Sequence, residues 1–413
     1  MHRHPRWSIA HEGFSAPRAT PRAQSKIAGG PSAFFFVSKI AFDDYYTLNL
    51  LHLFELLPHV AEAVNVSSLH EEDARSKHFD AFATRYGLDR AALSAPLAAS
   101  GYDDAVAIEN PAQDGHVERL RVKPLGRFGN LFSQLLHAIM LARALGVARI
   151  AFPAGPQPGP IPGPLCGNTG GIALEHDTPD TAPTLAAHFF WAAPFAPILS
   201  PAREAEAALA ALAPRYAHLV PDAPAEEIAV HCRAGDVFGA HDPQGYDWIV
   251  PIYVQPPVSY YQTAIARAHA EGGLSRVRLV YEGTENPAVE DLAAWMLRER
   301  IPFAAQSLTA AEDLRALMGA RILVTGCGTF AEAAALLSPH LRALWAFRGV
   351  ECHAHIQNRE EPLGARLLRA KGVAIRILAD AGDYIPPLAW TASAEQRTLL
   401  RNYPSAKLRD VRP

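Results

Sequence analysis

The chain has 413 residues, of which 49% are hydrophobic and 19% are charged. This composition is typical of a soluble globular protein large enough for two lobes, and it excludes the disordered, fibrous and membrane-embedded classes. Lys and Arg number 38 against 42 Asp and Glu, a net charge of −4, so no global positive charge favours nucleic acid or an anionic membrane as a partner.

The cysteines and the opening residues carry no signal of export. The four cysteines, Cys166, Cys232, Cys327 and Cys352, form no CxxC pair, so neither a zinc site nor a disulfide framework is indicated. Residues 1–30 lack the apolar core of a signal peptide, and no run is apolar for long enough to span a bilayer. We therefore expect a disordered leader, no transmembrane segment and a cytoplasmic location.

The first unit with a recognisable order of elements begins at Leu120. A short extended run at 120–124 precedes a Gly-containing loop, and an apolar helical face follows that loop. Asn130 is a favourable N-cap for the helix and Gly146 a favourable end, and 149–152 is predicted to be the next strand. Strand, loop, helix and strand in this order predict a βαβ unit.

The second half of the chain repeats this alternation of strands and helices. An Asn-Pro pair at 286–287 and a capping box from Thr309 to Glu312 mark two helix starts. Strands that alternate with helices predict a parallel sheet covered on both faces, with ligands at the carboxyl ends of the strands. The expected fold class is α/β, with two Rossmann-like lobes facing a central cleft. The predicted strands are 228–230, 277–281, 321–324 and 343–347, and the first of the two helices is 287–298.

These elements also set the expected domain boundaries. The segment 100–115 is polar and acidic and contains glycine, so it is the expected linker before the first lobe. The expected parts are a leader at 1–30, a helical region of unknown role at 31–115, an N-terminal lobe at 116–220, a C-terminal lobe at 221–390 and a tail at 391–413.

Three glycine-containing segments at strand ends carry the candidate chemistry. The first, Gly126-Arg-Phe-Gly-Asn130, combines a backbone that can turn tightly with the free N–H groups of a helix start. The second, His231-Cys-Arg-Ala-Gly-Asp236, places Arg233 just after a strand, where its planar fork suits a diphosphate. The third, Val324-Thr-Gly-Cys-Gly-Thr-Phe-Ala-Glu332, is again a strand, a Gly-rich turn and a helix.

Each of these motifs also has a purely structural interpretation. The first could be an ordinary strand-to-helix turn with Phe128 in the core. His231 could be a buried histidine bonded to backbone, and Arg233 could form a surface salt bridge. Thr329 and Glu332 have the spacing of a capping box, so Thr329 could simply cap its helix.

In this order and spacing, the three motifs resemble the fucosyltransferase superfamily of α1,2- and α1,6-fucosyltransferases and protein O-fucosyltransferases. The resemblance covers roughly residues 120–340. The segment 126–130 resembles the family's first Gly-Asn motif, and 231–236 resembles its His-x-Arg-x-Gly-Asp motif. Thr329-Phe330 stands where the family has Ser-Phe, and a strand that ends in the acidic residue Glu282 keeps its place between the motifs.

This resemblance implies a GT-B fold, with an acceptor on the N-terminal lobe and a GDP-sugar donor on the C-terminal lobe. It also implies transfer of a sugar, which in the family's pattern is fucose, to a hydroxyl of a glycan or other acceptor, with inversion and without a metal or other cofactor. Arg233 is the implied catalytic residue, because it would stabilise the leaving diphosphate. The implied donor-binding residues are Arg127, Phe128, Gly129, Asn130, His231, Gly235, Asp236, Glu282, Gly328, Thr329 and Phe330.

Two other functions are weighed against this one. Leu131, Ala234 and Gly283 replace residues that are usual in the family, which motivates a non-catalytic relative that binds a glycan or a nucleotide. A dinucleotide-dependent oxidoreductase ranks last, because no predicted strand is followed by G-x-G-x-x-G and a later acidic residue. The sequence singles out neither an acceptor, an oligomeric state nor a general base. Candidate bases are Glu282, Glu285 and Asp236.

Overall fold

The computed structural model describes most of both predicted lobes. The expected leader and most of the region 31–115 lie outside the described residues, although 80–86 is helical. The described residues are 80–87, 106–124, 127–153, 166–189, 202–239, 253–348, 357–358, 361–386 and 389–411.

The N-terminal sheet is mostly parallel and has the spatial order β1-β6-β2-β3-β5-β4. Strands β6, β2, β3 and β5 run parallel, and β1 and β4 pair with them antiparallel at the two edges. The chain moves outward from β2 through β3 to β5 and then returns to the other side of β2 as β6, so the strand order reverses between β2 and β6. The strands are β1 (Val106–Glu109), β2 (Arg119–Val122), β3 (Arg149–Pro153), β4 (Gly167–Thr169), β5 (Ile172–Asp177) and β6 (Thr184–Ala187).

The C-terminal sheet has the order β15-β14-β11-β10-β7-β8-β9. Its strands are parallel except for β15, which pairs antiparallel with β14 at the edge. When the parallel strands are numbered along the chain and read from the β9 edge, they stand in the order 3-2-1-4-5-6 of the doubly wound nucleotide-binding fold. The strand order reverses between β7 and β10. The strands are β7 (Ala225–Cys232), β8 (Val277–Tyr281), β9 (Phe303–Gln306), β10 (Ala320–Thr325), β11 (Ala343–Phe347), β14 (Ala374–Ala379) and β15 (Arg409–Val411).

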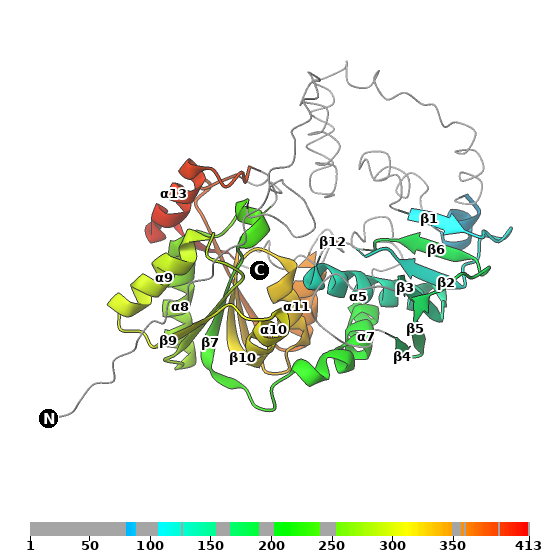
Figure 1. The fold of residues 1–413 in the computed structure, drawn as a ribbon, viewed down its shortest axis with the longest axis horizontal. Helices are drawn as coiled ribbons and strands as arrows, with labels where there is room; N and C mark the ends of the chain where they lie inside the picture. Colours follow the sequence, from blue (N-terminus) through cyan, green and yellow to red (C-terminus); the bar gives the residue numbers. More distant parts are fainter. Residues whose placement is uncertain are drawn as a thin grey trace, which may run out of the picture.

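Helices from both halves of the chain fill the space between the two sheets (Figure 1). One apolar core joins the inner faces of the sheets through α5, α7, α10, α11 and α12, while α8, α9 and α13 cover the outer face of the C-terminal sheet. The helices are α5 (Phe128–Leu145), α7 (Ala202–Leu212), α8 (Val258–Gly272), α9 (Pro287–Arg298), α10 (Ala310–Gly319), α11 (Thr329–Leu337), α12 (Leu363–Ala370) and α13 (Ala394–Asn402). Short 3-10 helices are η3 (Ala213–Leu219), η4 (Gly235–Phe238) and η5 (Ser405–Lys407), and β12 (Gln357–Asn358) pairs with β13 (Glu361–Pro362).

The predicted α/β class with two Rossmann-like sheets is confirmed, and so are the helix starts that rest on local capping chemistry. Asn286 caps α9 by accepting a hydrogen bond from the backbone N–H of Ala288, and Thr309 and Glu312 form a reciprocal capping box on α10. The predicted N-cap at Asn130 is wrong. The N-cap of α5 is Arg127, three residues earlier, and the Asn130 side chain accepts a hydrogen bond from Thr329 on a neighbouring helix.

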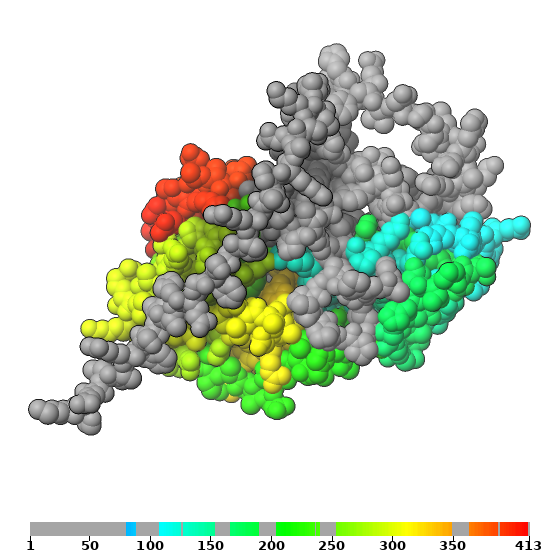
Figure 2. Space-filling view, viewed as in Figure 1, coloured from blue at the N-terminus to red at the C-terminus, as the bar shows by residue number. Residues whose placement is uncertain are grey.

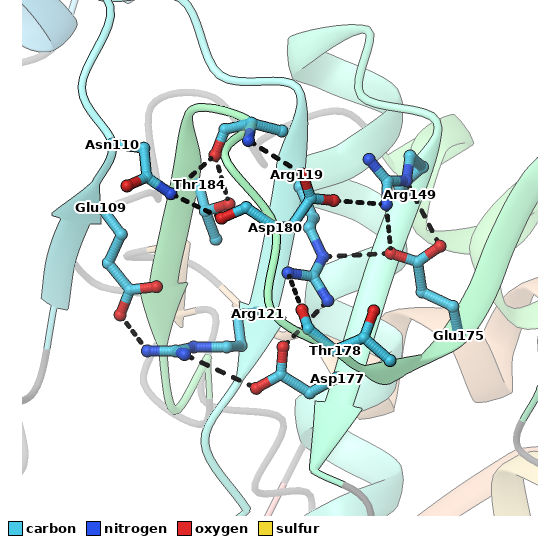
Figure 3. Close-up of polar contacts among 11 residues, drawn as sticks. Glu109, Asn110, Arg119, Arg121, Arg149, Glu175, Asp177, Thr178, Asp180 and Thr184 are labelled. Atoms are coloured by element: carbon cyan, nitrogen blue, oxygen red, sulfur yellow. Dashed lines mark hydrogen bonds and ion pairs between the residues drawn. The ribbon is translucent and has the colours of Figure 1, made fainter.

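The outer face of the N-terminal sheet is closed by charged side chains (Figure 3). The Arg119 guanidinium donates to Glu175 at 3.0 Å and to Asp177 at 2.9 Å, and only 3% of Arg119 is exposed. Arg149 pairs with Glu175 and with Asp180 on the same face. Among the described residues, ion pairs therefore stand where a second layer of helices was expected.

The segment expected to be a C-terminal tail forms part of the second sheet and its cover. Strand β15 pairs with β14 through residues 409–411, and α13 packs on α8 and α9. In the space-filling view these C-terminal residues lie directly against the yellow-green surface of α8 and α9 (Figure 2).

Candidate functional site

The candidate site lies where the strand order of the C-terminal sheet reverses. Strands β7 and β10 are parallel neighbours, so their carboxyl ends meet at one edge of the sheet. Arg233 follows β7 directly, and the turn 326–328 follows β10 and leads into α11. In open α/β sheets, ligands bind outside the carboxyl ends of strands at such a reversal, so these two segments occupy the expected position.

The Arg233 side chain lies against two neutral surfaces. A Cβ added to Gly328 would stand only 3.2 Å from Arg233 Cδ and 3.3 Å from its Nη1, so the arginine packs on glycine backbone. The ring of Tyr253 lies 5.0 Å from the guanidinium carbon, within the range of a cation–π contact. Gly328 has φ of +140°, a conformation that other residues rarely adopt. Both this backbone conformation and the closeness of Arg233 therefore require glycine at this position.

The backbone on both sides of Arg233 is fixed by hydrogen bonds. The Asn286 side-chain amide, which is fully buried, donates to the Arg233 carbonyl oxygen at 2.8 Å. The Gly326 N–H donates to the carbonyl oxygen of His231 at 2.9 Å, which ties the turn after β10 to the end of β7. A Cβ on Gly326 would stand 2.7 Å from the Tyr261 hydroxyl, so this second glycine permits the close approach.

His231 is buried and neutral beside these groups. Burial, together with the positive charges of Arg233 and Arg127, lowers the pKa of the imidazole to about 3. Its ring lies 5.6 Å from the ring of Phe330, and its Nδ1 is buried without a hydrogen-bond partner in the described part of the chain. His231 is thus buried, as its structural interpretation expected, and its ring packs on the aromatic side chain of Phe330.

The helix starts of the two lobes meet at this site. A Cβ on Gly129 would stand 2.5 Å from the Thr329 carbonyl carbon, so the first turns of α5 and α11 are in backbone contact. The Thr329 hydroxyl donates to Asn130 Oδ1 at 2.7 Å, and the rings of Phe128 and Phe330 make an edge contact at 6.0 Å. The predicted capping box at Thr329 is wrong: Gly328 is the N-cap of α11, and the Thr329 hydroxyl binds the other lobe instead.

A second link between the lobes involves charged groups. Arg127, the N-cap residue of α5, forms an ion pair with Glu282, which follows β8. The Glu282 carboxylate also lies over Gly235, whose φ is +64° and whose hypothetical Cβ would stand 3.2 Å from the carboxyl carbon. The Gly235 N–H donates to the Glu285 carboxylate at 3.3 Å, so both acidic residues face the first turn of η4.

The predicted site residues that the structure describes gather at one place. Contacts connect all three motifs, through Gly129 with Thr329, Phe330 with His231, and Arg233 with Gly328. Gly126 lies outside the described residues, and of Asp236 only the backbone position in η4 is described.

Two neighbours of Arg233 were missed in the sequence. Asn286 was recognised only as a helix cap, although one branch of its side chain caps α9 and the other binds the Arg233 carbonyl oxygen. Tyr253 follows no motif, and its contact with Arg233 could not be inferred from spacing along the chain.

Neither a metal centre nor a membrane-spanning helix is found within the described residues. No group of three or more His, Cys, Asp or Glu side chains there is arranged to hold a metal ion. No helix in the described ranges is both long and apolar enough to cross a membrane.

Comparison with known proteins gives structural likeness only. No protein-family model matches the chain, and neither does any curated protein. A crystal structure of POFUT1 in complex with GDP is 13% identical, with a TM-score of 0.33, over 54% of this chain and 94% of that one. Escherichia coli heptosyltransferase WaaC with ADP is also 13% identical, with a TM-score of 0.32, over 68% of this chain and 98% of that one. Likeness at this level carries no argument about the ligand or the reaction of this chain.

Proposed function

We propose that this chain is a glycosyltransferase that takes a sugar from a nucleoside diphosphate sugar at the reversal point of the C-terminal sheet. The observation that carries the proposal is the contact of Arg233 with the turn 326–328. An arginine after β7 and a glycine turn after β10 meet at the place where this fold class binds nucleotides.

The chemistry of these groups suits a diphosphate. A guanidinium presents several N–H donors in a rigid plane that matches two phosphate oxygens, and it stays charged at any physiological pH. The first turn of α11 offers backbone N–H groups and a partial positive charge, and Gly328 before it lets the Arg233 side chain pack beside this turn.

The reaction we propose is a direct displacement. An acceptor hydroxyl oxygen attacks the anomeric carbon of the sugar while the bond from that carbon to the diphosphate oxygen breaks, and the configuration inverts. The acceptor's proton passes to a base, and the departing diphosphate carries the negative charge. Arg233 and the α11 N-terminus would stabilise that charge as it develops, which is where such contacts accelerate a reaction.

A carboxylate would serve as the base in this scheme. Glu282 and Glu285 both lie beside Gly235, in the first turn of η4, and Glu282 also contacts the N-terminal lobe through Arg127. The acceptor would approach from the N-terminal lobe, which makes Glu282 the better placed of the two.

The donor we propose is a GDP-sugar, with GDP-fucose as the first choice and a glycan hydroxyl as acceptor. The support for guanine and fucose is the resemblance of the three motifs to fucosyltransferases. The donor would contact the motif residues Arg127, Phe128, Gly129, Asn130, His231, Arg233, Gly235, Asp236, Glu282, Gly328, Thr329 and Phe330. Transfer without a metal and a cytoplasmic location belong to the same proposal.

A panel of nucleotides tests this function. A ligand at 100 times its dissociation constant stabilises the folded state by about 2.7 kcal/mol, so GDP should raise the melting temperature more than UDP, ADP or NAD. Turnover of GDP-fucose, GDP-mannose and UDP-sugars is then measured with and without EDTA, and we expect EDTA to leave the rate unchanged. Binding of GDP without any turnover would instead identify a non-catalytic relative, and no binding of any nucleotide would contradict the proposal.

A further inference from the structure

The C-terminal segment reaches both loops that border Arg233. Arg397, on α13, donates to three backbone carbonyl oxygens: from Nη2 to Phe238 at 2.7 Å, from Nη1 to Glu285 at 3.2 Å and from Nε to Ala392 at 2.8 Å. Its guanidinium carbon also lies 5.1 Å from the centre of the Phe238 ring. One side chain thus joins the end of η4, the loop after β8 and the segment just before its own helix.

Trp390 reinforces this connection from the same segment. Its indole N–H donates to the carbonyl oxygen of Val237 at 2.6 Å, and its ring meets Phe238 edge-on at 5.3 Å. The side chain is fully buried, so the contact is part of the core and not a surface encounter. Helix η4 is therefore held by two hydrogen bonds from residues that lie more than 150 positions further along the chain.

One of the loops held in this way reaches the backbone of Arg233 directly. The Glu285 carboxylate accepts from the Gly235 N–H at 3.3 Å, and the adjacent Asn286 donates to the Arg233 carbonyl oxygen at 2.8 Å. Arg397 bonds the carbonyl oxygen of Glu285 itself. Loss of the Arg397 bonds would release η4 and the loop 282–286, and this loop supplies the Asn286 bond to the Arg233 carbonyl oxygen.

We propose that Arg397 is a positioning residue for the donor site, holding η4 and the loop 282–286 in the geometry that binds a nucleoside diphosphate. This inference rests on the proposed function for the identity of the ligand. The chemical basis is the guanidinium, since its donors point in several fixed directions and can reach three separate carbonyls. A lysine could satisfy only part of this set.

The test compares Arg397→Gln with Arg401→Gln. Arg401 is a matched control on the same helix, since it is half-exposed and forms a bidentate pair with Asp291 at 2.8 and 2.6 Å, away from both loops. Amide hydrogen exchange is measured first in the absence of nucleotide. We expect Arg397→Gln to speed exchange at 235–239 and 283–286 by about tenfold, with β7 and β10 unchanged, and Arg401→Gln to leave these amides as in the wild type.

Nucleotide binding supplies the second readout. We expect Arg397→Gln to weaken the Kd for GDP about tenfold, Arg397→Lys to weaken it less, and Arg401→Gln to leave it unchanged. Should Arg397→Gln fail to fold, Arg397→Lys keeps the charge and part of the bonding, and it should still speed exchange at 235–239 and 283–286 relative to the wild type.

The two hypotheses fail in different ways. Wild-type exchange rates at both loops in Arg397→Gln would overturn the positioning role, whatever the protein binds. Faster exchange in that variant, with no nucleotide bound by the wild-type chain, would support the structural clamp and overturn the proposed function. GDP binding that is equally weakened in Arg401→Gln would also overturn the inference, because a general loss of α13 packing would then explain it.

Discussion

The outer faces of the two sheets are closed by different means. On the C-terminal sheet, apolar side chains of β7, β8, β10 and β11 pack beneath α8, α9 and α13, and Trp345 and Phe347 are almost fully buried there. On the N-terminal sheet, the corresponding face carries Arg119, Arg121 and Arg149, which pair with acidic side chains (Figure 3).

The difference bears on where a ligand can be held. Apolar side chains cover both faces of the C-terminal sheet, and the ion pair of Arg278 with Glu227 joins two of its strands. Arg233 lies beyond the end of β7, at the edge where this fold class holds ligands. On the N-terminal sheet, Arg119 is the most buried partner of Glu175 and Asp177, and removing it would leave those carboxylates paired only with the more exposed Arg149 and Arg121. An arginine in the first sheet should therefore matter for stability, and Arg233 in the second for activity.

The largest expected effect is on turnover by Arg233→Lys. Lysine keeps the charge but cannot copy the planar fork, so we expect turnover to fall by on the order of 10²–10³ with little change in melting temperature. Arg278→Lys is the control, since Arg278 lies within β8 in the same sheet and pairs with Glu227. Steady-state kinetics and thermal melts of both variants are compared, and a wild-type rate in Arg233→Lys would rule out the diphosphate clamp.

Arg119→Met should lower the stability of the protein and leave its nucleotide binding unchanged. Removal of one partner from a buried ion pair costs about 3 kcal/mol, so chemical denaturation should show a clear loss of stability. The nucleotide affinity of the folded protein should not change. Arg121→Met provides the control, because Arg121 is 30% exposed in its side chain and its loss should cost no more than about 1 kcal/mol. Equal losses in the two variants would mean that burial does not distinguish these arginines.

Gly129→Ala tests the contact between α5 of the N-terminal lobe and α11 of the C-terminal lobe. The added methyl would stand 2.5 Å from the Thr329 backbone carbon, so α5 and α11 would have to move apart, at a cost of about 2 kcal/mol. Thr329→Ala added to this variant should not restore stability, because the clash is with backbone. Urea denaturation of the single and double variants measures the effect, and full rescue by Thr329→Ala would show that the hydroxyl alone is in the way.

Local signals explain what the sequence predicted well. Helix α9 and the start of α10 follow from Asn286-Pro287 and from the Thr309–Glu312 capping box, because each cap involves residues within one turn. The strands β7, β8, β10 and β11 are buried apolar runs between polar loops. Strand β6 was not predicted, since its four residues include two alanines, which are uncommon in strands.

Parts of the site depend on contacts between residues far apart in the sequence, and these were not predictable. The side chains of Asn130 and Thr329 have the chemistry of caps, but they bond each other across 199 positions of sequence. Arg233 and Gly328 could be singled out because each follows a strand, and parallel strands bring their carboxyl ends together. Tyr253 and Arg397 act through contacts in space that no periodicity records, so only the folded chain identifies them.

The smallest expected effect concerns a single buried acid in the layer between the sheets. Glu332, on α11, is 5% exposed, and neither carboxylate oxygen has a hydrogen-bond partner among the described residues. Burial raises the pKa of this carboxyl from 4.5 to about 8. The folded state therefore keeps a proton that the unfolded chain loses, and the stabilisation is complete below about pH 4.5 and falls as the pH rises toward 8.

Glu332→Gln should remove this dependence, because a neutral amide has no proton to lose. Between pH 6 and pH 7 the wild-type chain should lose at most about 1.4 kcal/mol from this residue, and the variant should lose less. Urea denaturation at each pH measures the slope, with the exposed Glu206→Gln on α7 as the control. Identical slopes in all three proteins would show that Glu332 is ionised in the folded state. In that case an ion pair, as on the outer face of the N-terminal sheet, would be needed to hold it.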